Sequence, residues 1–183
     1  IGAPVANSYG LAECAGLALM NPLSATGRRS TAGLPLPSTD IVIVDEQEPS
    51  RILPVGSAGE LLVRGPQVFA GYWNNDQDTG ATLRNGWLRT GDIAVMNEDG
   101  YLTILDRKDD LIVTGGLGVF PSEVEHVLLE HPAVADCAVV GLPDPRFGQR
   151  IAAVVVGRPG AAVLHDQLRE FCAERLPAQL VPH

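Results

Sequence analysis

The sequence predicts a mixed α/β chain, with a β-rich part followed by a small α+β part. Three short apolar runs in the first part are bounded by Gly, Pro and Asp, as strands usually are: residues 40–45, 59–64 and 100–105. Beyond Asp106 the pattern changes, because apolar residues recur at helical spacing in two segments and continuous apolar runs lie between them. A chain of 183 residues is long enough for one ordinary domain or two small ones.

Turn residues flank the expected strands of the β-rich part. Residues 31–37 precede the first strand and residues 97–100 precede the last, and both segments contain the Gly, Pro, Asn or Asp that turns favour. Residues 76–83 are expected to form a short helix. Together these elements predict a compact β unit.

The α+β part is expected to contain a strand pair, a helix, two strands and a second helix. Ser122 is expected to cap the first helix, with Glu125 placed for a capping box, and this helix should stop near Pro132. Residues 134–140 and 151–156 are the expected strands. One side of the second helix is lined by apolar residues: Val163, Leu164, Leu168, Phe171, Cys172 and Leu176.

Composition excludes several classes of partner. A net charge of −9 disfavours nucleic acid, because no stripe of Lys and Arg is available to replace the counterions of phosphates. The longest apolar run, residues 151–156, is far shorter than the roughly 20 residues that span a bilayer, so no transmembrane segment is expected. Three cysteines without CxxC spacing argue against a disulfide framework and favour the cytoplasm.

Four motifs follow one another in a fixed order. They are NSYGLAE at residues 7–13, GELLVRGPQVFAGYWN at 59–74, GWLRTGD at 86–92 and DRKDDLIVTGGLGVFPSEVE at 106–125. In this combination they resemble the adenylate-forming superfamily, which includes acyl-CoA synthetases, luciferases and peptide-synthetase adenylation domains. The pattern is most similar to that of the acyl-CoA synthetases.

The resemblance implies a division into domains. Residues 1–106 are expected to be the C-terminal portion of the large adenylation domain, its β-rich subdomain. Residues 107–109 are expected to form a hinge, and residues 110–183 an incomplete small C-terminal lid domain.

The resemblance also implies that the chain is a fragment, truncated at both ends. The family's phosphate-binding loop is expected upstream of Ile1 and its catalytic lysine beyond His183. Lys108 is the one lysine in the sequence and lies in a different motif. Residues 1–183 alone are therefore expected to be inactive in adenylation, and robust acid-dependent pyrophosphate exchange by them would contradict this expectation.

The first motif resembles the family's adenine site and implies roles for four residues. Ser8, Tyr9 and Gly10 are expected to bind nucleotide, and Glu13 is expected to bind Mg²⁺, which prefers hard oxygen ligands. Ala12 stands where the family has a threonine, so the hydroxyl that would bind phosphate is absent. The structural alternative is a surface turn with an ordinary acid.

Asp92 and Arg107 are the other nucleotide-binding residues that the resemblance implies. An ionised carboxylate offers two acceptor oxygens, which match the two neighbouring hydroxyls of a ribose. Arg107 is expected to reach the ribose or a phosphate. The structural alternatives are a turn leading into residues 93–95 for Asp92 and a surface salt bridge for Arg107.

The last motif implies a hinge and a CoA tunnel. Asp109 is expected to be the hinge residue about which the small domain rotates between two half-reactions. Gly115 and Gly116 are expected to line the pantetheine tunnel, although Gly118 stands where the family commonly has Asn. The structural alternatives are a solvated acid and a β-hairpin turn that needs positive φ.

These implied roles predict that the parent protein is an ATP- and Mg²⁺-dependent acid:CoA ligase. It would convert a carboxylic acid, a fatty acid first and an aryl acid second, into an acyl-AMP that CoA then intercepts. A non-catalytic nucleotide- or adenylate-binding homologue is one alternative, favoured by Ala12, by Gly118 and by the absence of the catalytic lysine from these residues. An adenylation domain that loads a carrier protein is the other.

No further chemistry is expected from the remaining histidines and cysteines. His126, His131 and His165 have no metal-ligand spacing and are interpreted as residues of helix surfaces or ends. The cysteines are interpreted as core residues.

Overall fold

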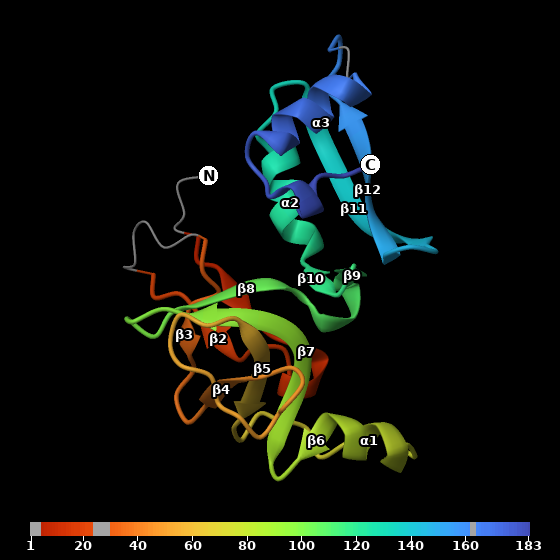
Figure 1. The fold of residues 1–183 in the computed structure, drawn as a ribbon. Helices are drawn as coiled ribbons and strands as arrows, with labels where there is room; N and C mark the ends of the chain where they lie inside the picture. Colours follow the sequence, from red (N-terminus) through yellow and green to blue (C-terminus); the bar gives the residue numbers. More distant parts are fainter. Residues whose placement is uncertain (1–4, 24–29, 162–163) are drawn as a thin grey trace. The chain divides into compact units, whose positions relative to one another are not determined.

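The computed structural model describes residues 5–23, 30–161 and 164–183, so that Val163 of the predicted last helix lies outside the described residues. The chain divides into two compact units, Ile1–Lys108 (unit 1) and Asp109–His183 (unit 2) (Figure 1). The boundary falls within residues 107–109, the range predicted for the hinge.

Unit 1 is built on a five-stranded antiparallel sheet. Its strands run in the order β4-β5-β7-β6, and β8 also pairs with β7. The strands are β4 (Asp40–Val44), β5 (Gly59–Arg64), β6 (Leu83–Arg84), β7 (Trp87–Met96) and β8 (Leu102–Arg107). The predicted strands at 40–45 and 59–64 are confirmed, and β8 begins two residues later than predicted.

The longest strand of unit 1, β7, was not predicted. It contains Arg89, Thr90, Gly91 and Asp92, which interrupt the apolar alternation by which a strand is recognised. Tertiary pairing compensates for this weak local signal, because β7 has partner strands on both of its edges. The interpretation of Gly91–Asp92 as a simple turn is therefore wrong.

A smaller antiparallel sheet, a 3₁₀ turn and a short α-helix complete unit 1. The sheet consists of β1 (Ser8–Tyr9), β2 (Leu19–Met20) and β3 (Leu34–Pro35), and β3 lies within residues 31–37, which were expected to be a turn. The 3₁₀ turn η1 (Ala12–Cys14) follows β1. The predicted helix is confirmed as α1 (Asp76–Thr82), and Asn75 caps it by accepting a hydrogen bond from the backbone of Asp78.

The core of unit 1 lies between the two sheets and is almost entirely apolar. Burial of these side chains is the main stabilising contribution, because it removes apolar area from water. The buried residues are Cys14, Ala18, Leu19, Ile43, Leu61, Val63, Leu88, Ala94 and Leu102.

Two acids, Glu60 and Asp92, are also buried in unit 1. Glu60 on β5 is 2% exposed. Both of its oxygens accept hydrogen bonds from Arg89, at 3.1 and 2.6 Å, and Oε2 also accepts from Lys108 Nζ at 3.0 Å. Burial raises the pKa of Glu60, but the bonds and charges of Arg89 and Lys108 outweigh it, so the pKa lies below its usual value. These three residues tie β5, β7 and the end of β8 together.

Replacing Glu60 with glutamine is expected to lower the free energy of unfolding by about 2 kcal/mol at neutral pH, because two cations lose their buried counter-charge. The depressed folded-state pKa means that the carboxylate stabilises the fold fully above its unfolded-state value, near 4.5, and less as the pH falls through the folded-state value. The difference between wild type and Glu60→Gln should therefore shrink below about pH 4.5.

Urea unfolding of the whole protein at several pH values measures this difference. Glu48→Gln is the matched control, since Glu48 is an exposed acid in the loop between β4 and β5. Equal stability of Glu60→Gln and Glu48→Gln at neutral pH would contradict a stabilising role for the buried acid.

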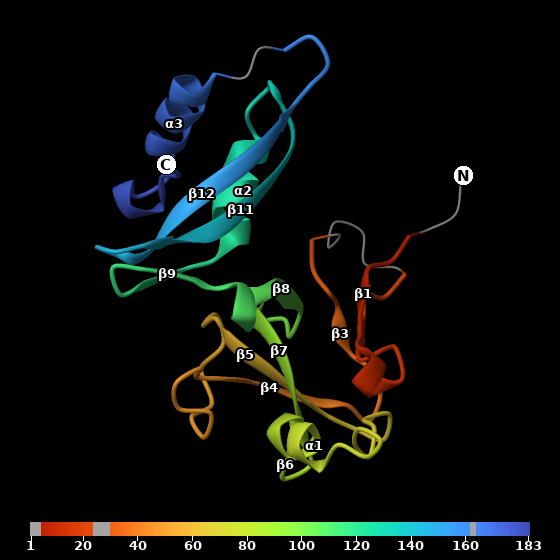
Figure 2. The same cartoon turned by 90° about the vertical axis from the view of Figure 1, so that its right-hand side faces the viewer.

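Unit 2 has the predicted order of elements: two strands, a helix, two strands and a helix. An antiparallel sheet in the order β10-β9-β12-β11 forms its base, and two helices lie beside the β11–β12 hairpin (Figure 2). The elements are β9 (Ile112–Thr114), β10 (Leu117–Val119), α2 (Pro121–Leu129), β11 (Val134–Asp144), β12 (Gly148–Gly157), α3 (His165–Ala173) and the 3₁₀ turn η3 (Ala178–Leu180). A further 3₁₀ turn, η2 (Lys108–Asp110), spans the boundary between the two units.

Both helices pack on the same face of this sheet. Val124 and Leu128 of α2 and Cys172 of α3 share one core with Val139 of β11 and Ile151 of β12. The strands therefore bury alternate residues, and the helices bury one stripe. Cys14 and Cys172 are buried and Cys137 is half-buried, which confirms that the cysteines are core residues, and their thiols are free.

The predicted cap of α2 is wrong. The helix begins at Pro121, with Phe120 as its N-cap residue, so Ser122 lies inside the first turn. Proline is well suited to the first helical position, since its φ is already helical and its missing N–H would have no intrahelical partner. Glu125 completes no capping box, because its Oε1 accepts a hydrogen bond from the backbone of Val139 at 2.8 Å.

Candidate functional site

Asp92 lies at an irregularity of β7. Glu60 pairs with Ile93 and Leu62 pairs with Arg89, so β7 has extra residues opposite Leu61. Gly91 has a φ of +72° within this bulge, a conformation that side-chain-bearing residues rarely adopt. Bulges re-aim the side chains beside them, and here the bulge precedes Asp92.

Tyr9 and Arg107 both contact the Asp92 carboxylate. The Tyr9 hydroxyl donates a hydrogen bond to Asp92 Oδ2 at 2.5 Å, and Arg107 Nε lies 3.6 Å from Oδ1. Arg107 is also the cross-strand partner of Asp92 in the β7–β8 ladder. Three residues predicted to bind nucleotide, from three separate motifs, are therefore brought together.

The environment of this cluster favours a neutral tyrosine beside a carboxylate. Burial, and then the hydrogen bond to Asp92, raise the pKa of Tyr9 well above its usual value, so its hydroxyl remains a donor. Asp92 is 6% exposed, whereas the Arg107 side chain is 73% exposed and can reach into solvent. The Arg107 guanidinium is therefore the charged group of this cluster that faces solvent, whereas the Asp92 carboxyl group is shielded from it.

Ser8 and Gly10 flank Tyr9. Ser8 is exposed on β1 and pairs with Met20. A Cβ on Gly10 would come within 1.9 Å of the Gly16 carbonyl oxygen, so the fold itself requires glycine at this position. The close approach of the Gly10 and Gly16 backbones is a structural reason for glycine at position 10. It is separate from the predicted contact of Gly10 with the nucleotide.

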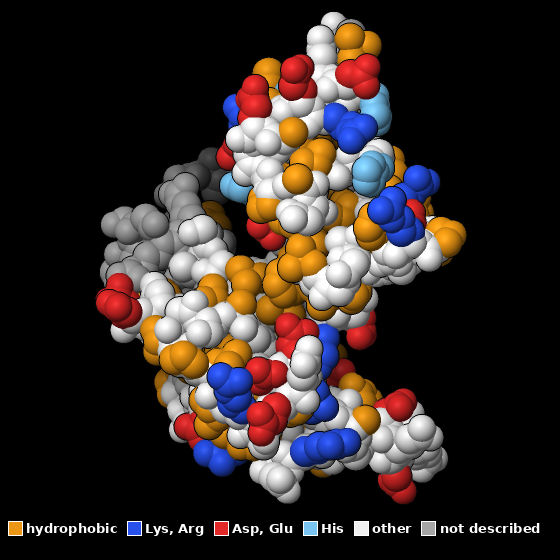
Figure 3. All heavy atoms as spheres, in the orientation of Figure 1, with side chains coloured by type: hydrophobic (Ala, Val, Ile, Leu, Met, Phe, Trp, Pro, Cys, Tyr) orange, Lys and Arg blue, Asp and Glu red, His pale blue; other side chains and the backbone are white. Residues whose placement is uncertain are grey.

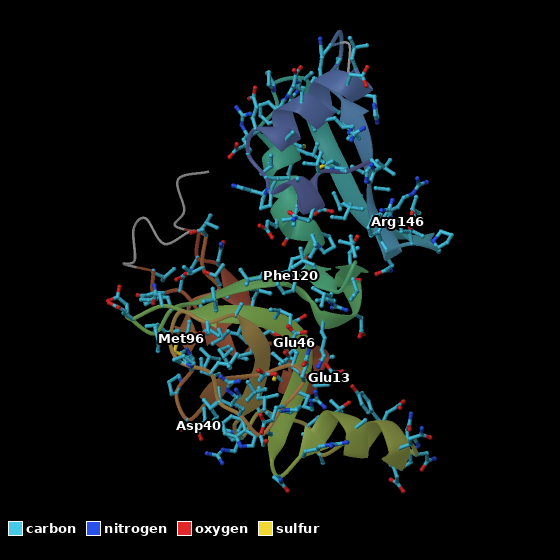
Figure 4. The ribbon with its side chains drawn as sticks, viewed as in Figure 1. Glu13, Asp40, Glu46, Met96, Phe120 and Arg146 are labelled. Carbon is cyan, nitrogen blue, oxygen red and sulfur yellow. The ribbon has the colours of Figure 1, made fainter. Side chains whose placement is uncertain are left out.

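Glu13 lies in η1, on the side of unit 1 where α1 is found (Figure 4). Its Oε1 accepts a hydrogen bond from the Tyr72 hydroxyl at 2.7 Å, and this bond raises the pKa of Tyr72. Within the described ranges, no group of three or more His, Cys, Asp or Glu side chains has the geometry of a metal site. A single carboxylate fits Mg²⁺, which commonly binds one or two carboxylates together with substrate phosphates.

Asp109 is the first residue of unit 2 and lies in η2. The preceding residue, Lys108, is fixed in unit 1 by its ion pair with Glu60 and lies 3.4 Å from the carbonyl oxygen of Glu46. The chain therefore passes directly from an anchored residue into the predicted hinge.

Gly115 and Gly116 form the two-residue turn between β9 and β10. Their φ values of +57° and +85° are those of a type I′ turn, so the hairpin interpretation is correct. Gly115 also lines a cavity of about 520 Å³ within unit 2, together with Phe147, Arg150 and His183. Gly116 is not among the residues that line it. The turn thus combines a structural requirement with a place beside a cavity.

The charge distribution on the surface and the length of the helices are two further features of the described residues. On the face drawn in Figure 3, the basic and acidic side chains of unit 1 are interspersed rather than gathered into a basic stripe. Among the helices that the structure describes, none has the length and apolar character needed to cross a membrane.

Sequence reasoning missed two residues of this site. Thr90 accepts a hydrogen bond from the Asp92 backbone and donates one to the Leu61 carbonyl, and Tyr72 contacts Glu13. Thr90 lies within the motif at 86–92 and Tyr72 within the motif at 59–74, and this position in a motif was the one indication in the sequence that they could belong to the site. The Thr90–Leu61 and Tyr72–Glu13 contacts do not follow from spacing, because their partners come from distant elements.

Two family matches cover most of the chain. Residues 1–73 match the AMP-binding enzyme family, and residues 123–183 match the AMP-binding enzyme C-terminal domain. The long-chain-fatty-acid–CoA ligase of Escherichia coli O6:H1 is 42% identical over 174 residues, which are 95% of this chain and 30% of the ligase.

One further CoA ligase and one solved structure are similar to nearly the whole of this chain. The 2-succinylbenzoate–CoA ligase of Geobacillus kaustophilus is 40% identical over 99% of this chain and 36% of its own length. The crystal structure of ATP-bound MatB from Rhodopseudomonas palustris has a TM-score of 0.94 and 34% identity, with 99% of this chain and 36% of that one covered. The chain therefore spans about a third of the length of these relatives.

Proposed function

We infer that the whole protein is an ATP-dependent acid:CoA ligase, and we proceed from the fact that this chain belongs to the adenylate-forming superfamily of AMP-binding enzymes. The observation that carries the proposal is the shielded Asp92 carboxylate, contacted by Tyr9 and Arg107 from separate elements. The named relatives are acid–CoA ligases, which supports the same reaction class.

In the proposed reaction the residues of unit 1 bind and orient ATP. The Asp92 carboxylate accepts hydrogen bonds from the two ribose hydroxyls, the Tyr9 ring packs beside the adenine next to Ser8 and Gly10, and the Arg107 guanidinium donates to the ribose or a phosphate. The acid then attacks the α-phosphate, an acyl–AMP bond forms and pyrophosphate leaves. Holding the reactants in line is the main contribution of these residues.

Glu13 is the proposed ligand of Mg²⁺. The cation, when bound, neutralises charge on the phosphates of ATP. The role of Glu13 is to supply one carboxylate oxygen on a short 3₁₀ turn, next to the strand that carries Tyr9.

Unit 2 is proposed to serve the second half-reaction. Rotation about Asp109 would bring the turn at Gly115 and Gly116 toward the adenylate, and the thiol of CoA would then displace AMP and form the thioester. The cavity that Gly115 lines supports this role, because it offers room for a bound group beside the turn.

A long-chain fatty acid is the first proposed substrate, since the Escherichia coli relative is named for that class, and an aryl acid is the second. We place the protein in the cytoplasm, because its three cysteines are free thiols.

Acid-dependent ATP–pyrophosphate exchange by the whole protein tests the proposal directly. A panel of fatty, aryl and amino acids reports the first half-reaction without assuming an acceptor. Exchange with fatty or aryl acids, followed by AMP release on addition of CoA, is the expected result. A folded, ATP-binding protein that is silent with every acid would instead support a non-catalytic homologue.

Replacing Gly115 with asparagine is expected to raise KM for CoA by about tenfold and to leave pyrophosphate exchange unchanged. Asparagine tolerates positive φ better than other side chains, so the turn should persist while the side chain fills space beside the cavity. Thioester formation at varied CoA concentrations measures the effect.

Gly160→Asn is the matched control for this substitution. Gly160 also lies in unit 2, has a φ of +79° and would meet nothing within 4 Å with a Cβ. If both variants raise KM for CoA equally, the effect reflects strained glycine positions rather than the tunnel.

A further inference from the structure

The proposed metal ligand, Glu13, is held by a tyrosine from a motif that has no assigned role. Tyr72 lies in the motif at residues 59–74 and donates its hydroxyl to Glu13 Oε1 at 2.7 Å. No residue of the described part of the chain donates a hydrogen bond to Oε2. One oxygen of the carboxylate is therefore held, and the other remains available.

Tyr72 is itself fixed by its neighbours. Its ring packs edge-on against Phe69, with the centroids 4.8 Å apart, and Phe69 packs on the core of unit 1. The backbone N–H of Tyr72 donates to Thr79 Oγ1 of α1 at 2.9 Å. A Cβ on Gly71 would come within 2.6 Å of Thr79 Cγ2, so the residue before Tyr72 must be small.

The same segment also holds the backbone of Glu13. The N–H of Phe69 donates to the Glu13 carbonyl oxygen at 2.8 Å. Phe69 therefore sets where the Glu13 backbone lies, and Tyr72 sets the direction of its side chain. A flexible acid that is held at both points loses less conformational freedom when it binds a cation.

We propose that Tyr72 is a positioning residue for the metal-binding carboxylate of Glu13, holding one oxygen so that the other faces Mg²⁺. This inference rests on the proposed function, which makes Glu13 a ligand of the Mg²⁺ that accompanies ATP. Partners of metal ligands commonly tune metal affinity in this way. The effect should matter here, because a site with few protein ligands depends on the orientation of each.

The test is the dependence of nucleotide affinity on Mg²⁺ in the full-length protein. The nucleotide is α,β-methylene-ATP, which cannot release pyrophosphate and therefore cannot react. Its Kd is measured in EDTA and in saturating Mg²⁺, and the readout is the Kd in EDTA divided by the Kd in Mg²⁺. Tyr72→Phe is expected to reduce this ratio about threefold to tenfold and to leave the Kd in EDTA unchanged, since only one hydrogen bond is removed.

Two further variants complete the experiment. Glu13→Gln is expected to reduce the ratio at least as much as Tyr72→Phe. Trp73→Phe is the matched control, because this neighbouring aromatic residue is 91% exposed, and the variant should keep the wild-type ratio.

Three outcomes would overturn the inference. If Tyr72→Phe keeps the wild-type ratio while Glu13→Gln loses it, Glu13 binds the metal without help from Tyr72. If Tyr72→Phe weakens binding equally with and without Mg²⁺, its role is structural. If Glu13→Gln also keeps the ratio, the proposed metal ligand itself is wrong, and the positioning role fails with it.

Discussion

Replacing Asp92 with alanine is expected to lower acid-dependent pyrophosphate exchange by about 100-fold to 10,000-fold, through weaker binding of ATP. The substitution removes the two charge-assisted hydrogen bonds that Asp92 is proposed to accept from the ribose, each worth about 1.5–3 kcal/mol. It also removes the acceptor of the Tyr9 hydroxyl. Exchange kinetics at varied ATP concentrations, together with a direct measurement of the Kd for ATP, give the effect.

Glu98→Ala is the control for Asp92→Ala, since it removes one negative charge from an exposed position of the same unit. Asp92→Asn should fall between wild type and alanine, because the amide keeps the shape and one acceptor oxygen. If Asp92→Ala binds ATP as tightly as Glu98→Ala does, the ribose assignment is wrong.

Replacing Asp109 with proline is expected to slow thioester formation by about 100-fold and to leave adenylation nearly intact. Proline fixes φ near −65°, so the chain loses a rotation at the residue that follows the anchored Lys108. Single-turnover measurements of acyl-AMP formation, and then of its conversion by CoA, separate the two half-reactions.

The control for the hinge is Asp109→Ala, which removes the carboxylate and leaves the backbone free to rotate. It should resemble wild type in both half-reactions. Equal loss of adenylation and thioester formation in Asp109→Pro would count against the hinge, since a local disturbance of the fold would then explain both.

The fold was predictable wherever local pattern and tertiary structure agree. Strands β4 and β5 are short apolar runs with turn residues at their ends, and α1 has an asparagine cap. The strand β7 was not predictable, because its central residues serve the bulge and interrupt the apolar alternation, and its pairing with β5 joins residues that are not neighbours in sequence. The start of α2 was misjudged because Pro121 began the helix before Ser122 could cap it.

The candidate site shows the same contrast. Resemblance to a family selected Tyr9, Asp92 and Arg107, and the fold brings these three side chains together. Motif spacing gave no indication that Tyr72 contacts Glu13, since the two residues are 59 positions apart. Contacts of this kind depend on how loops cross, which a linear pattern does not contain.

The bulge in β7 also limits which residues can occupy the position before Gly91. The Thr90 hydroxyl accepts a hydrogen bond from the Asp92 N–H at 3.0 Å and donates one to the Leu61 carbonyl at 2.8 Å, where the ladder is interrupted. Serine can supply the same donor and acceptor. Valine has the shape of threonine but would leave an N–H and a carbonyl without these partners. At this position chemical identity therefore matters more than volume, and an isosteric substitution would be the damaging one.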